Sequence, residues 1–227
     1  GSYTIVVTAT EPGNTYNSVT INVTLDTQKP KVLDFNPLPG AFVKGTVPIN
    51  IRVNEPNVRE MRVQVNGQDI PNNTTDQDNF TVMWDTSGIE LDGPQTITIK
   101  IKDKANNEIT QEIAVTLDRV SPATVIQFPR SDTPLRRGGT ISVVIDVVDA
   151  QSNSISPYAV DVLITRMDGS YLGRVTRTNT RNSGNKLTWS GRIRWQNSLP
   201  NTFKIVANAV DKAGNVAATQ EVTVTIR

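Results

Sequence analysis

The chain repeats itself, and this internal repeat constrains the fold more than any other feature of the sequence. Three segments alternate apolar and polar residues and each ends in an acidic residue: 5–11, 97–103 and 205–211. Each is followed by a turn segment rich in Gly, Asn or Ala, residues that tight hairpins favour. Because successive side chains of a strand point to opposite faces, this alternation predicts β-hairpins and not helices.

A second alternating strand closes each copy, at 19–25, 113–117 and 222–226. The first two closing strands run into the same boundary signal, Leu-Asp-x-x-x-Pro, at Asp26 and at Asp118. The front of the unit repeats as well, since 47–53 and 141–147 both alternate and both precede an acid. The units therefore begin after each Leu-Asp signal.

These repeats predict an all-β chain of tandem immunoglobulin-like antiparallel β-sandwich domains, each with about seven strands. The predicted domains are 28–119 and 120–227, preceded by a hairpin at 1–27. Two origins of the hairpin stay open. It is either the C-terminal hairpin of a preceding, incomplete Ig-like domain or a pair of strands that completes a sheet in a neighbouring chain.

The composition argues against catalysis. The 227 residues contain no Cys and no His, which excludes disulfides, thiol nucleophiles and the usual general base near neutral pH. No apolar run approaches the roughly 20 residues of a membrane span. The net charge is +1, but 28–119 holds 10 Lys+Arg against 13 Asp+Glu, whereas 120–227 holds 13 against 7. The sequence predicts no enzyme, no nucleic-acid partner and no membrane span.

Two stretches resemble bacterial Ig-like repeats of cell-surface, S-layer and adhesin proteins. The opening stretch runs from Asn36-Pro37 through the alternating 47–53 to Glu55-Pro56. The closing stretch is Asp-x-Ala-x-Asn at 103–107 and Asp-x-Ala-Gly-Asn at 211–215, with Asn106 where the pattern has Gly. The resemblance implies an extracellular or cell-surface protein and says more about fold than about activity.

The sequence places three acids together in each domain. In an Ig-like sandwich, the loops after the second and sixth strands lie at the same end as the incoming linker, so an acid from each should converge. Hard oxygen ligands suit calcium, and three adjacent carboxylates repel one another without a cation; alternatively, these acids cap turns. The two predicted sets are Asp26, Glu55 and Asp103, and Asp118, Asp149 and Asp211.

The second domain also predicts a basic surface within 171–195, a stretch longer than its counterpart in the first domain. This surface would dock an anionic glycan or an acidic subunit, or else be a solvated face. Trp84, Trp189 and Trp195 invite a sugar-stacking interpretation, but core positions are favoured. The basic set is Arg174, Arg177, Arg181, Lys186, Arg192 and Arg194.

The predicted function is therefore structural: a stalk or adhesive segment of a bacterial extracellular repeat protein that spaces or presents other domains. Its partners would be neighbouring domains of the same large protein, further copies in a fibre or layer, or surface glycans. The alternative is a glycan- or surface-binding accessory region of a secreted hydrolase.

Overall fold

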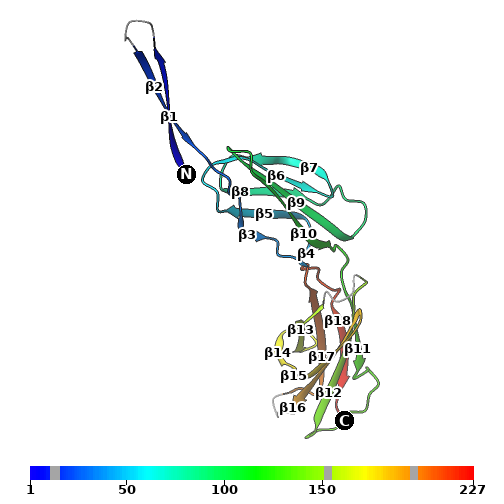
Figure 1. Cartoon of the computed structure of the whole chain (residues 1–227). Helices are drawn as coiled ribbons and strands as arrows, with labels where there is room; N and C mark the ends of the chain where they lie inside the picture. Colours follow the sequence, from blue (N-terminus) through cyan, green and yellow to red (C-terminus); the bar gives the residue numbers. More distant parts are fainter. Residues whose placement is uncertain (11–15, 151–154, 195–198) are drawn as a thin grey trace. The chain divides into compact units, whose positions relative to one another are not determined.

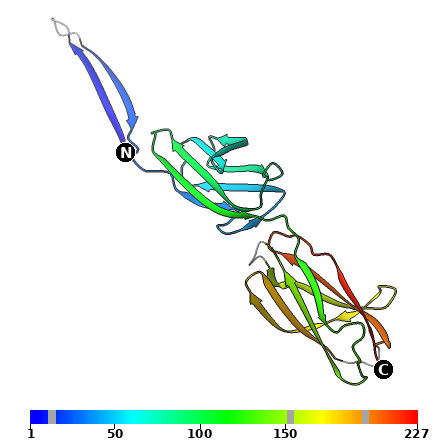
Figure 2. The same cartoon turned by 90° about the vertical axis from the view of Figure 1, so that its right-hand side faces the viewer.

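The computed structural model describes residues 1–10, 16–150, 155–194 and 199–227, and these residues form strands joined by turns and loops (Figures 1 and 2). No helix occurs within these ranges, which confirms the all-β prediction. The chain groups into two compact units. One comprises Gly1–Leu38, Pro48–Trp84 and Thr96–Ile113, and the other Pro39–Val47, Asp85–Gln95 and Ala114–Arg227.

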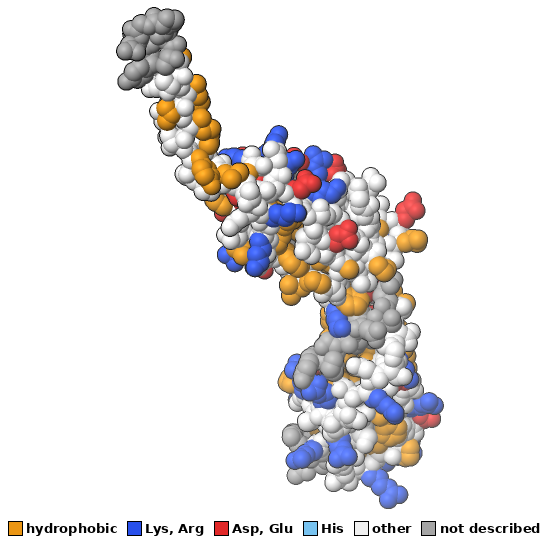
Figure 3. Space-filling view, in the orientation of Figure 1, with side chains coloured by type: hydrophobic (Ala, Val, Ile, Leu, Met, Phe, Trp, Pro, Cys, Tyr) orange, Lys and Arg blue, Asp and Glu red, His pale blue; other side chains and the backbone are white. Residues whose placement is uncertain are grey.

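A β-hairpin opens the chain, formed by β1 (Ser2–Thr10) and β2 (Tyr16–Thr24). The cross-strand pairs Tyr3↔Val23, Ile5↔Ile21 and Val7↔Val19 place apolar side chains on one face of the hairpin. All six of these side chains are exposed, and hydrophobic side chains run along this hairpin in Figure 3. The turn predicted at Pro12-Gly13-Asn14, and Glu11 before it, lie outside the described residues.

The first sandwich has eight strands in two sheets, ordered β4-β10-β9-β6-β7 and β3-β5-β8. Its core follows from strict alternation: β5 buries every second residue, and Ile97, Ile99 and Ile101 of β9 are fully buried. The strands are β3 Val32–Asn36, β4 Phe42–Val43, β5 Thr46–Val53, β6 Val58–Val65, β7 Gln68–Thr75, β8 Asn79–Asp85, β9 Gly93–Asp103 and β10 Glu108–Leu117.

The second sandwich also has eight strands, in sheets ordered β11-β12-β16-β15 and β14-β13-β17-β18. The long middle stretch of its sequence forms β14, β15 and β16. The strands are β11 Ala123–Phe128, β12 Thr140–Val148, β13 Ile155–Thr165, β14 Tyr171–Arg174, β15 Thr176–Ser183, β16 Lys186–Arg194, β17 Thr202–Asp211 and β18 Gln220–Thr225.

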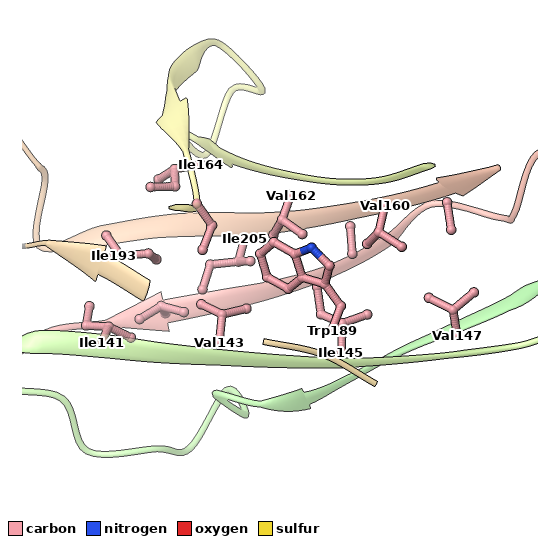
Figure 4. Close-up of a cluster of buried hydrophobic side chains, with 14 of the residues drawn as sticks. Ile141, Val143, Ile145, Val147, Val160, Val162, Ile164, Trp189, Ile193 and Ile205 are labelled. Carbon is pink, nitrogen blue, oxygen red and sulfur yellow. The ribbon is translucent and has the colours of Figure 1, made fainter. Parts of the chain in front are cut away.

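The core of the second sandwich centres on Trp189, whose indole lies among Val143, Val162 and Ile205 between the sheets (Figure 4). Close packing explains the glycine two residues later: a Cβ at Gly191 would lie 2.4 Å from Cη2 of the Trp189 ring. Trp84 is buried in the same way in the first sandwich. The core interpretation is confirmed for Trp84 and Trp189, whereas Trp195 lies outside the described residues.

Candidate functional site

The structure brings each predicted set of three acids together. Within each set, one carboxylate oxygen per residue lies within 4.8 Å of the others. The members come from equivalent places: the segment that enters the sandwich, the loop after a front strand (β5 or β12), and the last residue of a long strand (β9 or β17). The first cluster is Asp26, Glu55 and Asp103, and the second is Asp118, Asp149 and Asp211.

The second cluster is the more enclosed. Asp118 and Asp149 have no exposed surface and Asp211 is 5% exposed. One oxygen of Asp118, Oδ1, accepts a hydrogen bond from the backbone N–H of Val120 at 3.1 Å. The other, Oδ2, is buried and accepts no hydrogen bond from any described residue. A buried carboxylate oxygen without a donor is costly, because it has lost its water without a replacement.

The pKa of the Asp118 carboxyl is shifted because the group is enclosed. Burial raises the pKa of Asp118 from 3.8 to about 6; the Val120 hydrogen bond opposes the rise, and the carboxylates of Asp149 and Asp211 add to it. The carboxylate of Asp92 acts in the same direction. The folded protein therefore presents a site where a positive charge would be favourable.

An asparagine holds the second cluster in shape. The side-chain Nδ2 of Asn215 donates to Oδ2 of Asp211 at 2.8 Å and to the backbone carbonyl of Asp118 at 2.9 Å. The backbone N–H of Asn215 donates to Oδ1 of Asp211 at 2.7 Å. Asn215 thereby ties the linker residue Asp118 to the turn after β17, and it is itself buried.

The first cluster repeats this arrangement with looser burial. Nδ2 of Asn107 donates to Oδ2 of Asp103 at 2.8 Å and to the carbonyl of Asp26 at 3.2 Å. Glu55 accepts from the backbone N–H of Asn57 at 2.8 Å, and Asp26 accepts from Gln28 at 3.0 Å. Asp26 is half-buried, unlike its counterpart Asp118.

The two interpretations of the acids are compatible. Several of the carboxylates cap turns, as the hydrogen bonds of Asp26, Glu55 and Asp118 show. A carboxylate nonetheless has about four acceptor positions, so capping leaves lone pairs free. Two oxygens that bind one calcium at about 2.4 Å can lie at most about 4.8 Å apart, and both clusters fall within this limit. The donor set therefore fits a hard divalent cation such as calcium.

Sequence reasoning did not identify the two asparagines that hold the clusters. Their signal is present in the repeated motif, since Asn107 and Asn215 both follow the last acid by four residues. The preceding residue shows why the motif tolerates Asn for Gly. Asn106 has a φ of 70° and Gly214 a φ of 82°, and Asn adopts this left-handed conformation more readily than most residues.

The five predicted arginines fall into two groups, and Lys186 stands apart from both. Arg174 pairs with Asp161 at 2.9 Å, and together with Arg177 these residues line a hollow of about 570 Å³ beside Trp189. Arg181, Arg192 and Arg194 are exposed on β15 and β16. Ile193, between two of them, is buried, as its alternation predicts. Lys186 pairs with Asp146 at 2.8 Å.

Comparisons with known proteins support the fold and no specific family. No protein-family model matches the sequence, and no curated protein matches it either. The fibronectin(III)-like modules of CbhA from Clostridium thermocellum are similar in structure, with 13% identity, a TM-score of 0.54, and coverage of 87% of this chain and 94% of theirs. Rst D1-D2 has 11% identity, a TM-score of 0.42 and coverage of 88% and 100%.

The chain therefore has tandem domains of the Ig and fibronectin-III-like sandwich fold. A search of the described residues for a helix that is long and apolar enough to cross a membrane finds none.

Proposed function

We propose that this chain is a calcium-stiffened spacer from a bacterial extracellular repeat protein, in which tandem sandwiches hold other domains apart. One observation carries the proposal: the second acidic cluster joins the linker residue Asp118 to the ends of β12 and β17, and leaves Oδ2 of Asp118 without a donor. A spacer needs linkers that hold one conformation, and a cation bound at Asp118 would hold this linker in place.

The physical role of the cation follows from the cluster. Three carboxylates within 4.8 Å repel one another, so the linker is held against an electrostatic cost. Calcium would remove that cost and add bonds to Oδ2 of Asp118 and to carboxylate oxygens of Asp149 and Asp211, with water completing its 6 to 8 oxygens. The linker then loses freedom to bend. The equivalent cluster at Asp26, Glu55 and Asp103 would act in the same way at the preceding linker.

A structural role is also consistent with the rest of the chain. The sequence lacks His and Cys, and the fold is one on which function resides in surfaces and loops. The extracellular and bacterial assignments rest on the resemblance of the Asp-x-Ala-Gly-Asn and Asn-Pro stretches to surface-protein repeats.

The test is thermal unfolding by calorimetry with calcium and with EGTA, together with small-angle scattering of the same samples. Calcium at about 100 times its Kd would stabilise the second sandwich by about 2.7 kcal/mol, and so raise its Tm by about 10 °C. The scattering should show a narrower range of particle lengths with calcium.

Asp149→Asn should remove the calcium effect, whereas Asp132→Asn, at an exposed acid in the same sandwich, should leave it unchanged. Identical Tm and scattering in calcium and EGTA would overturn the proposal and leave the acids as turn caps.

A further inference from the structure

The second sandwich has an excess of positive charge, and five of its Lys and Arg residues lie on β15 and β16. Of its acids, Asp149 and Asp211 are buried in the cluster, and Asp146, Asp161 and Glu221 already pair with cations. Lys and Arg side chains therefore predominate on its surface, as the view in Figure 3 illustrates.

Three arginines share the outer face of β15 and β16. Along β16 the buried residues Leu187, Trp189 and Ile193 face the core, so Arg192 and Arg194 face outward. Arg181 lies directly opposite Thr188, which alternates with the same buried set and therefore also faces outward. No carboxylate of the described chain pairs with Arg181, Arg192 or Arg194.

The three arginines lie along the strand direction of the sheet. Residues two apart on a strand are separated by about 7 Å, and Thr188 and Arg194 are separated by about 20 Å. The guanidinium groups of Arg181, Arg192 and Arg194 therefore follow one direction along the sheet. We call this surface, with the residues between them, the basic strip.

Small polar side chains form the floor between the arginines. Arg192 lies between Ser142 and Thr176, and Arg194 lies opposite Thr140. Ser190 and Asn179 lie opposite each other in the same strip. The strip is thus rich in hydroxyl groups. Beside it, β12 places Val144 opposite Ser190 and Asp146 opposite Thr188, and the exposed Phe128 of β11 lies opposite Val144.

We infer that the basic strip binds a linear acidic polysaccharide, with Arg181, Arg192 and Arg194 pairing with its carboxylate or sulfate groups. Arginine binds such groups through two parallel N–H bonds, and the neighbouring hydroxyl side chains can hydrogen-bond sugar hydroxyls. A protein partner would use apolar or aromatic anchors and single-stranded nucleic acid would use stacking aromatics, and the described positions between the arginines hold small polar side chains instead.

The experiment measures binding of the whole chain to immobilised polygalacturonate, with dextran as the neutral reference, in EGTA so that the acidic clusters hold no calcium. We expect saturable binding to polygalacturonate that weakens steeply with added salt, and none to dextran. Arg192→Gln with Arg194→Gln should weaken binding at least tenfold.

The matched control is Arg52→Gln with Lys100→Gln, which removes the same charge from exposed positions of the first sandwich. It should change affinity by less than about twofold if the strip is the site. Arg181→Gln alone should weaken binding by a smaller factor, which tests the strip without the double change.

An equal loss in the control variant would overturn the inference, because it would show attraction to net charge alone. Binding to single-stranded DNA or to an acidic protein as tight as to polygalacturonate would also overturn it, as would the absence of binding to polygalacturonate.

Discussion

The two acidic clusters share one plan and differ in how far they are closed. Each gathers an acid from the entering linker, a front loop and a long strand, and each is held by an asparagine. Asp26 is half-buried, whereas its counterpart Asp118 is fully buried and has an oxygen without a donor. The comparison teaches that one motif can yield a partly solvated cluster in one place and a fully enclosed cluster in another.

The two sandwiches should differ most in the stability that each loses when its cluster asparagine is replaced. Asn215→Ala would leave Oδ2 of Asp211 and the carbonyl of Asp118 buried without a donor, and should destabilise the second sandwich by about 3 kcal/mol. Asn107→Ala should cost the first sandwich about 1 to 2 kcal/mol, because water can reach the partly exposed Asp26 and the site that Asn107 leaves, although Asp103 is buried. Hydrogen exchange followed peptide by peptide would assign each loss to its sandwich. Equal losses would remove the distinction between the clusters.

A smaller difference between the clusters should appear in how stability depends on pH, because Asp118 has a raised pKa. The pKa of Asp118 is raised above its unfolded value of 3.8 to about 6, so the folded state holds a proton that the unfolded state has released. In EGTA, the stability from this group is therefore present at low pH and is lost as pH rises from about 4 through 6, by about 3 kcal/mol. Urea unfolding across this range should detect the slope.

Calcium should flatten or reverse that slope, because it competes with the proton for the carboxylate. Asp118→Asn should abolish the contribution, and Asp26→Asn serves as the control at the equivalent, half-exposed position. A slope that persists unchanged in Asp118→Asn would mean that another group causes it.

The smallest difference should come from substitutions at Gly214 and Asn106, the turn residues that precede the two asparagines. Gly214→Ala should destabilise the second sandwich by about 1 kcal/mol, because its φ of 82° disfavours a side chain. Asn106→Gly should be neutral within a few tenths of a kcal/mol, since the φ of 70° suits glycine as well as asparagine. Thermal unfolding of both variants would measure these two changes in stability. A destabilising Asn106→Gly would point to the hydrogen bond that Arg59 donates to the Asn106 side chain.

Much of this structure follows from alternation in the sequence. The buried residues of β5 and β9 are those that the period of two selects, as are those of β12 apart from Asp146, and the convergence of the acids follows from sandwich topology. The unpaired oxygen of Asp118 could not be read from the sequence, because it depends on which backbone N–H groups reach the linker. The division of the arginines into two groups depends on the register of β15 against β16, which alternation alone does not fix.

The exposed hairpin has a practical consequence for solubility. Four of its apolar residues, Ile5, Val7, Ile21 and Val23, match positions that β9 and β10 bury, yet here they face water on an open two-stranded ribbon. Such a ribbon exposes an apolar face and unpaired strand edges, which favour concentration-dependent aggregation. Preparations of the two sandwiches should therefore stay in solution longer when residues 1–25 are omitted or when Ile5 and Ile21 are replaced by threonine.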